Sequence, residues 1–298
     1  MNIEEELHFE KIFIQSIKAK WLDEKNVSLD VLRLDLIHPV ISGNKWFKLK
    51  YYIKDAKENN ASTIATFGGA YSNHILATAY ACRIAGLKSI GIIRGEEPKN
   101  LSHTLMNAGS LGMELHFVNR NEYDVFDKNS FKNIYWIDEG GHGIKGAEGA
   151  KGIIELIKNK KKYSHIICAV GTGTTLAGMI KTLSANQEAI GISVMKNNTG
   201  LHDQIRHLLE KNDSENFKII HDFHFGGYAK HTKELVSFMN ETWMEHQLPT
   251  DFVYTAKTFF AIKKIIEQKR IPHGSSVLMI HTGGLQGNLS LPSNSLHF

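Results

Sequence analysis

The chain of 298 residues is long enough for two domains or one large one. Its 42% of hydrophobic and 22% of charged residues are ordinary for a soluble globular protein of enzyme size. The net charge of +4 is modest, and the densest basic run, residues 158–162, is expected to form a solvated face rather than a nucleic-acid site. No apolar run approaches the length of a membrane span, so no membrane partner is expected.

The two cysteines, Cys82 and Cys168, both lie inside apolar runs. Two cysteines allow at most one disulfide, so no disulfide framework is possible and a reducing compartment is favoured. The first six residues are acidic and lack a long apolar core, which does not match a secretory signal peptide. These features predict a cytoplasmic protein.

From residue 62 onward, strand-like and helix-like stretches alternate along the chain. Buried strands are predicted at residues 63–67, 89–93, 113–118, 166–170, 189–195 and 276–280. Helices are predicted at residues 73–85, at 101–111, from about 146 to about 160, and from 176 onward. Residues 119–133 are polar and patternless, which predicts a loop. Such alternation is typical of an α/β fold with mostly parallel sheets covered by helices.

A turn rich in glycine and threonine follows the strand predicted at residues 166–170. It consists of Gly171, Thr172, Gly173, Thr174 and Thr175, and a predicted helix continues from it. Glycine lets the backbone bend sharply beside a ligand, and free N–H groups at a helix start attract an anion. The turn therefore predicts a phosphate-binding cup, with a plain strand-to-helix turn as the alternative.

The residues around this cup narrow the choice of phosphate. A P-loop requires a lysine directly after its last glycine, and none follows here. A dinucleotide fingerprint has its third glycine earlier than Gly178 and an acid at the end of the next strand to bind the ribose. Lys196 follows the next predicted strand instead, which leaves an NADP site open because a basic residue suits a 2′-phosphate.

Four further glycine-bearing segments lie at the ends of predicted strands or the starts of helices: residues 42–50, 67–74, 138–142 and 281–284. In open α/β sheets, ligands bind beyond the carboxyl ends of the strands. Several glycine turns placed there predict one shared crevice. Ser72 and Asn73 form a good helix cap, and the N–H groups behind them are also suited to a substrate carboxylate.

This ordered set of motifs resembles the 1-aminocyclopropane-1-carboxylate deaminase and D-cysteine desulfhydrase family of pyridoxal-phosphate (PLP) enzymes. The resemblance covers about residues 43–284 and rests on Gly-Asn-Lys, Gly-Gly-x-x-Ser-Asn-His, Arg-Gly-Glu, Glu-Gly-Gly, the threonine-rich cup and His-Thr-Gly-Gly. It implies fold type II, the fold of the tryptophan synthase β-subunit. Residues 46–144 would form the smaller domain, and residues 1–45 with 145–298 the larger, PLP-binding domain.

The resemblance also implies how PLP is held. Lys45, in the Gly-Asn-Lys motif, would form the Schiff base with the cofactor, for which its amine must be partly neutral. Gly171 through Thr175 would hold the 5′-phosphate. Asn73 would hydrogen-bond the phenolic oxygen, and Thr282 would face the pyridine nitrogen.

On the substrate side, the resemblance assigns the carboxylate of a small amino acid to Ser72, Asn73 and His74, with Ser72 near the reacting carbon. Tyr228 and Tyr254 match the two active-site tyrosines of the family, which stack on the ring or move a proton. A homodimer is also implied. A metal site is not expected, because the histidines show no spacing that supplies a full ligand set.

One departure from the deaminase pattern bears on the reaction. The deaminases of this family carry glutamate after the second tyrosine, where it pairs with the pyridine nitrogen, and this chain carries Thr255. A neutral hydroxyl makes the ring a weaker electron sink than a carboxylate does. The sequence therefore predicts a D-cysteine desulfhydrase-like α,β-elimination that yields a keto acid, ammonia and sulfide.

Three other functions stay open at this stage. The first is 1-aminocyclopropane-1-carboxylate deaminase activity, which opens the ring to give 2-oxobutyrate and ammonia. The second is an NADP-dependent oxidoreductase, and the third is an RNA-binding protein that uses the basic residues 158–162. The order of the motifs argues against the last two.

Overall fold

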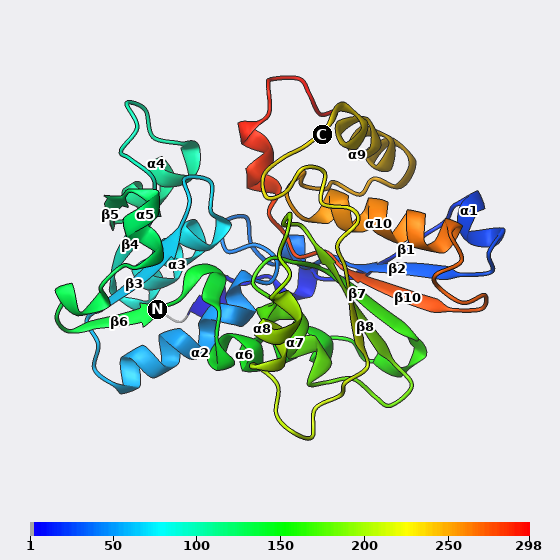
Figure 1. Cartoon of the computed structure of the whole chain (residues 1–298), viewed down its shortest axis with the longest axis horizontal. Helices are drawn as coiled ribbons and strands as arrows, with labels where there is room; N and C mark the ends of the chain where they lie inside the picture. The colour runs from blue at the N-terminus through cyan, green and yellow to red at the C-terminus, as the bar shows by residue number, and fades with distance from the viewer. Residues whose placement is uncertain (1–2) are drawn as a thin grey trace.

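The computed structural model describes residues 3–298, which form two β-sheets covered by helices (Figure 1). The larger sheet has the strand order β1-β2-β10-β7-β8-β9, and only β1 runs antiparallel to its neighbour. Its strands are β1 (Ile14–Ile17), β2 (Ser28–Leu32), β7 (His165–Val170), β8 (Glu188–Ser193), β9 (Phe217–Ile220) and β10 (Ser276–Ile280).

The smaller sheet has the order β5-β4-β3-β6 and is entirely parallel. Its strands are β3 (Thr63–Gly68), β4 (Lys88–Arg94), β5 (Met113–Val118) and β6 (Ile134–Ile137). The helices are α1 (Lys20–Asp23), α2 (Lys45–Glu58), α3 (Asn73–Ala85), α4 (His103–Ser110), α5 (Arg120–Asp124), α6 (Ile144–Glu155), α7 (Thr174–Ile180), α8 (Leu201–Arg206), α9 (Lys233–His246) and α10 (Thr255–Glu267). The α/β architecture with mostly parallel sheets is confirmed.

Alternate residues of the larger sheet face two separate hydrophobic cores, as the two-residue period of a strand requires. In β10, Leu278 and Ile280 face the core shared with α2, α6 and α7, whereas Val277 and Met279 face the core beneath α10. Figure 1 shows α9 and α10 above this sheet and α6, α7 and α8 below it. The near-continuous apolar strands follow from this covering of both faces.

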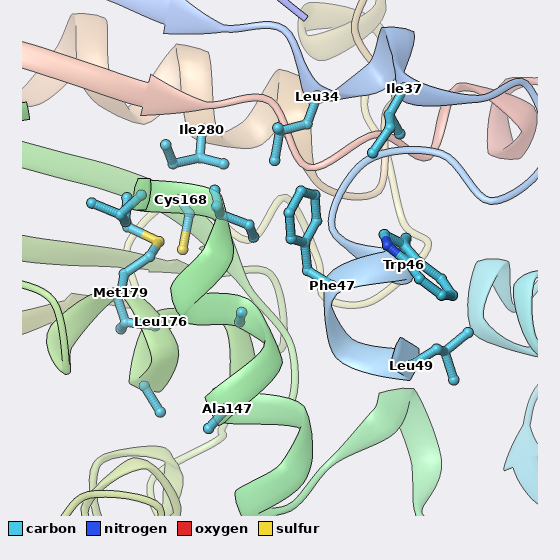
Figure 2. Close-up of a cluster of buried hydrophobic side chains, with 14 of the residues drawn as sticks. Leu34, Ile37, Trp46, Phe47, Leu49, Ala147, Cys168, Leu176, Met179 and Ile280 are labelled. Carbon is cyan, nitrogen blue, oxygen red and sulfur yellow. The ribbon is translucent and has the colours of Figure 1, made fainter. Parts of the chain in front are cut away.

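Helix α2 joins the two sheets, because its buried residues belong to one core with both of them. That core contains Ile64 and Ile137 of the smaller sheet and Ile166 of the larger one. Figure 2 shows the Phe47 ring extending from α2 toward Leu34 and the strand residues of the larger sheet. The first turn of α2 is therefore anchored between the sheets.

The domain division at residues 45/46 and 144/145 remains a proposal. In its favour, all four strands of the smaller sheet lie between residues 63 and 137, and the strands of the larger sheet lie outside that range. Since α2 begins at Lys45 and packs on both sheets, the first boundary falls at a rigid helix rather than at a linker.

Most predicted elements are present, with two differences. The helix predicted to reach about residue 160 ends at Glu155, and beyond it Lys162 and Tyr163 bind the Asp30 carboxylate, with 2.9 and 2.7 Å between the bonded atoms. The predicted loop at residues 119–133 contains the short helix α5, because the Asn119 side chain accepts two backbone N–H groups of its first turn. Among residues 3–298, no helix combines the length and apolar character that a membrane crossing requires.

Candidate active site

One cavity of about 550 Å³ lies where the two sheets meet. Its walls follow the carboxyl ends of strands from both sheets: Gly69 follows β3, Glu139 follows β6, Gly171 follows β7 and Thr282 follows β10. Parallel α/β sheets bind ligands at such ends. Every residue predicted for the site lines this cavity: Lys45, Ser72, Asn73, His74, Gly171, Thr172, Gly173, Thr174, Thr175, Tyr228, Tyr254 and Thr282.

The first turn of α2 is placed against the end of β10 through a residue that must be glycine. Gly43 has φ +66°, and a Cβ atom there would lie 1.9 Å from the Thr282 carbonyl oxygen. The next residue, Asn44, donates its backbone N–H to that same oxygen over 3.3 Å. The glycine of the Gly-Asn-Lys motif therefore allows the chain to pass directly over β10 and deliver Lys45 into the cavity.

Lys45 is a buried amine held in a defined orientation. Its Nζ donates to Asn44 Oδ1 over 2.6 Å, and the Asn44 amide in turn donates to Thr175 Oγ1 over 2.7 Å. Burial lowers the pKa of Lys45 to about 8, although the Asp251 carboxylate partly opposes the shift. About a tenth of the amine is therefore neutral at pH 7 and about half at pH 8, which makes it available as a nucleophile or base.

Lys48 is a second buried amine in the same cavity, and the sequence interpretation assigned it no role. It lies three residues after Lys45, so both side chains leave the same face of α2. Its Nζ donates to the Gly140 carbonyl oxygen. Burial and the charge of Lys45 place its pKa well below the usual lysine value. The three-residue spacing of the two lysines, which places them on one face of a helix, is the sequence signal that could have identified Lys48.

The phosphate cup is a loop whose hydroxyl groups are linked to one another and to His142. Thr172 Oγ1 and Thr174 Oγ1 lie 3.1 Å apart, and His142 Nδ1 lies 3.2 Å from Thr174 Oγ1. Gly173 has φ +82° at the N-cap of α7, a conformation that favours glycine. The cup is thus preformed, with loop and first-turn N–H groups and three hydroxyls beside the two buried lysines.

At the opposite wall, Ser72 caps helix α3 and His74 is held as a neutral ring. Ser72 Oγ accepts the Ile75 N–H over 3.3 Å. The Thr66 hydroxyl donates to the Ile137 carbonyl over 2.8 Å, so His74 Nε2, 2.9 Å from that hydroxyl, is the donor of their hydrogen bond. Burial and the two lysines place the pKa of His74 well below its usual value.

This tautomer limits what His74 offers a substrate. Because its only N–H is given to Thr66, its Nδ1 is an acceptor, and it has no hydrogen-bond partner among the described residues. The expected donation from His74 to a carboxylate does not fit this arrangement. Ser72, Asn73 and the first-turn N–H groups of α3 are the donors that remain on this wall.

Tyr228 and Tyr254 form a pair above Lys45. Their hydroxyl oxygens lie 3.4 Å apart, and their rings meet edge to face with centroids 6.0 Å apart. Lys45 Nζ lies 5.9 Å from the centroid of the Tyr254 ring. Desolvation raises the pKa of both phenols, although 44% of Tyr228 is exposed, so both carry their protons near neutral pH.

The residue after the second tyrosine does not face the cavity. Thr255 is fully buried, and its hydroxyl donates to Asp251 Oδ1 over 2.7 Å. Asp251 also accepts the backbone N–H groups of residues 253–255, so its carboxylate caps α10. Thr282 therefore supplies the hydroxyl on this side of the cavity.

Among the described residues that line the cavity, Glu139 carries the single carboxylate. It is paired with the Arg94 guanidinium over 2.6 Å, and both side chains are half-exposed. Arg94 also lies over the Tyr123 ring. The Glu139 carboxylate at the cavity wall is therefore engaged in an ion pair with Arg94.

A family model described as "Pyridoxal-phosphate dependent enzyme" matches residues 18–283 of the chain. The chain belongs to this family. The match confirms PLP as the cofactor and fold type II as the fold, and it argues against the NADP alternative.

Similar proteins include members of the deaminase and desulfhydrase family that the motifs predicted. A relative from Thermotoga maritima, itself named only provisionally as a 1-aminocyclopropane-1-carboxylate deaminase, is 33% identical over 90% of this chain and 92% of its own length. A bifunctional D-cysteine desulfhydrase/1-aminocyclopropane-1-carboxylate deaminase from Arabidopsis thaliana is 28% identical over 86% of this chain and 72% of its own length. A crystal structure of a homologue of that deaminase matches with TM-score 0.80 and 24% identity, covering 93% of this chain and 90% of the other.

The residues present fit PLP by their chemistry. The aldehyde requires an amine that is partly neutral, and the pKa of Lys45 is about 8. The phosphate requires cationic and N–H donors in a confined space, which Lys48 and the cup residues supply. The space beside Gly171 is open, because a Cβ atom there would come within 4 Å of only the Tyr254 ring among the described residues.

Proposed function

We propose that this enzyme catalyses α,β-elimination from D-cysteine. One water is consumed, and pyruvate, ammonia and hydrogen sulfide are released. The α C–H and β C–S bonds break, and no oxidant or reductant is needed. PLP, bound at Lys45, supplies the conjugated ring that takes up the electron pair of the breaking α C–H bond.

Lys45 would hold the cofactor and act as the base that receives the α-proton at Nζ. Its lowered pKa supports this role, because the neutral amine is already available near pH 8. Lys48 and Gly171 through Thr175 would bind the phosphate. With that dianion beside it, the Lys48 amine regains its proton, and the two opposite charges compensate each other in the buried site.

Ser72 and Asn73 would bind the substrate carboxylate with the first turn of α3. Asn73 would also contact the phenolic oxygen of the cofactor. His74, through its hydrogen bond to Thr66, would hold the first turn of α3 in place. Tyr228 and Tyr254, both protonated, would shield the ring and deliver a proton to the departing sulfur. Thr282 would face the pyridine nitrogen.

The observation that supports elimination over ring opening is the chemistry around Thr282. Thr255 is engaged by Asp251, and Glu139 is paired with Arg94, so no free carboxylate among the described residues lines this wall. A neutral hydroxyl does not keep the pyridine nitrogen protonated as a carboxylate would. Loss of an α-proton is less demanding than opening a cyclopropane ring that has no α-hydrogen.

The test is a substrate comparison with the purified holoenzyme. We expect sulfide and pyruvate from D-cysteine at a kcat/KM at least about 10-fold above that for 2-oxobutyrate formation from 1-aminocyclopropane-1-carboxylate, a gap of about 1.4 kcal/mol. Lys45→Ala should abolish both activities, whereas Lys54→Ala, an exposed lysine on the same helix, should leave them unchanged. Faster 2-oxobutyrate release would replace the proposal with the deaminase.

We also propose that the enzyme is a cytoplasmic homodimer, as the family resemblance and the buried free thiols of Cys82 and Cys168 support. Light scattering on the purified protein tests the oligomeric state: a mass of twice 33.5 kDa is expected, and a single-chain mass would contradict it.

A further inference from the structure

Lys257 is a fully buried lysine outside the cavity lining. It is the third residue of α10, and none of its surface is exposed. Its Nζ donates to the Gly227 carbonyl oxygen over 2.8 Å. Burial lowers the pKa of its ammonium to about 8, and the Asp251 carboxylate partly opposes the shift.

This position is costly for a cation. A buried ammonium loses its hydration, and the first turn of a helix carries positive partial charge that disfavours a lysine. An apolar residue of similar size would fill the same volume at lower cost, since replacing buried charges by packed apolar groups is often neutral or stabilising. Stability of the core therefore does not account for Lys257, and its hydrogen bond is the feature to explain.

The acceptor belongs to a loop with an unusual backbone. Residues 225, 226, 227 and 229 all have positive φ, at 50°, 90°, 115° and 52°. Phe225 and Ala229 carry side chains, for which this conformation is unfavourable. The Gly227 carbonyl also accepts the backbone N–H of Lys230 over 3.2 Å, but that bond lies within the loop. The hydrogen bond from Lys257 joins the strained loop to a rigid helix.

Each end of this link carries one tyrosine of the active site. Gly227 directly precedes Tyr228, and Lys257 lies three residues after Tyr254, which begins α10 as its N-cap. The distance of 3.4 Å between the two phenol oxygens therefore depends on how the loop is placed relative to the helix.

We propose that Lys257 is a positioning residue that ties the loop of residues 225–229 to α10 and thereby sets the geometry of the Tyr228–Tyr254 pair. The catalytic consequence rests on the proposed function, but the tie itself does not. Substitution of Lys257 removes this hydrogen bond and frees the loop without replacing any residue that lines the cavity.

The first test needs no substrate. Hydrogen exchange of the holoenzyme is followed by mass spectrometry in Lys257→Met and in Lys263→Met, a half-buried lysine of the same helix whose Nζ lies 5.9 Å from the Phe238 ring centroid. We expect amides of residues 224–232 to exchange about 10-fold faster in Lys257→Met, and at the parental rate in Lys263→Met. Parental exchange in Lys257→Met would overturn the proposal. Should that variant fail to fold, Lys257→Leu takes its place with the same criterion.

The second test is a kinetic cycle with D-cysteine. We expect Lys257→Met to lower kcat about 10- to 100-fold with a smaller change in KM, because a misplaced catalytic group costs rate rather than binding. Combining it with Tyr228→Phe should cost no more than about twofold beyond Tyr228→Phe alone, since both changes remove the same contribution. Losses that multiply would show that Lys257 acts elsewhere and overturn the proposal. If the parent enzyme consumes no D-cysteine, the proposed function fails. The hydrogen-exchange result still shows whether Lys257 holds the loop to α10.

Discussion

At the scale of single residues, two buried lysines three positions apart define the chemistry of the cavity. Lys45 was identified from the Gly-Asn-Lys motif, whereas the importance of Lys48 came from the structure. Sequence patterns could not reveal that the Nε2–H of His74 is given to Thr66, because this depends on a hydrogen bond from β3 to β6. Residue identity was predictable from the motifs, but protonation states depend on burial and on neighbours from distant segments.

The lowered pKa of Lys45 predicts how the apoenzyme takes up its cofactor. A folded-state pKa of about 8, below the usual 10.5, means that the neutral amine accumulates as the pH rises through 8. The rate of PLP attachment, followed by absorbance, should therefore rise about 16-fold from pH 6.5 to 8 and level off above pH 9. A rate that continues to climb to pH 10 would contradict the buried state of this amine.

Lys48 should contribute to the affinity for PLP. We expect Lys48→Met to weaken the binding of PLP to the apoenzyme about 10- to 100-fold, as loss of a charged hydrogen bond of about 1.5–3 kcal/mol implies. The matched control is Lys54→Met on the exposed face of the same helix, where the binding constant should not change. Equal affinities in the two variants, measured by fluorescence titration, would show that Lys48 does not contact the phosphate.

At the scale of elements, three of the four strands whose ends form the cavity walls, β3, β7 and β10, were predicted from the sequence, whereas the four-residue edge strands β1, β6 and β9 were not. The long apolar runs of β3, β4, β7 and β10 are strong signals because both faces of these strands are covered. In contrast, β1 and β9 have four residues each and lie at sheet edges, and helix α5 depends on a single Asn119 cap. Such elements are determined by tertiary contacts more than by local pattern.

Gly43 lies directly against the Thr282 backbone that follows β10, which predicts that any side chain at this position destabilises the fold. Gly43→Ala should lower the free energy of unfolding by more than about 2 kcal/mol, because its Cβ would overlap the Thr282 carbonyl and φ is +66°. Gly86→Ala is the control: φ is +73°, but a Cβ would meet no described atom within 4 Å, so a loss of about 1 kcal/mol is expected. Urea unfolding of both variants would contradict the account if the two losses were equal.

At the scale of the whole molecule, the site exists because two sheets direct their carboxyl ends at one cavity, and α2 and α6 join them through a shared core. The sequence predicted a shared crevice from glycine turns at strand ends. It did not predict that one continuous core would span both sheets, since that depends on how α2 packs between them. The rigidity of this junction is what holds Lys45, Lys48 and the cup in one arrangement.

The most direct measurement of this arrangement is borohydride reduction of the holoenzyme followed by peptide mass spectrometry. The account predicts a pyridoxyl phosphate group fixed to Lys45 alone, with loss of the visible absorbance of the bound cofactor. A label on Lys48, Lys257 or any other lysine in place of Lys45, or no label at all, would contradict it.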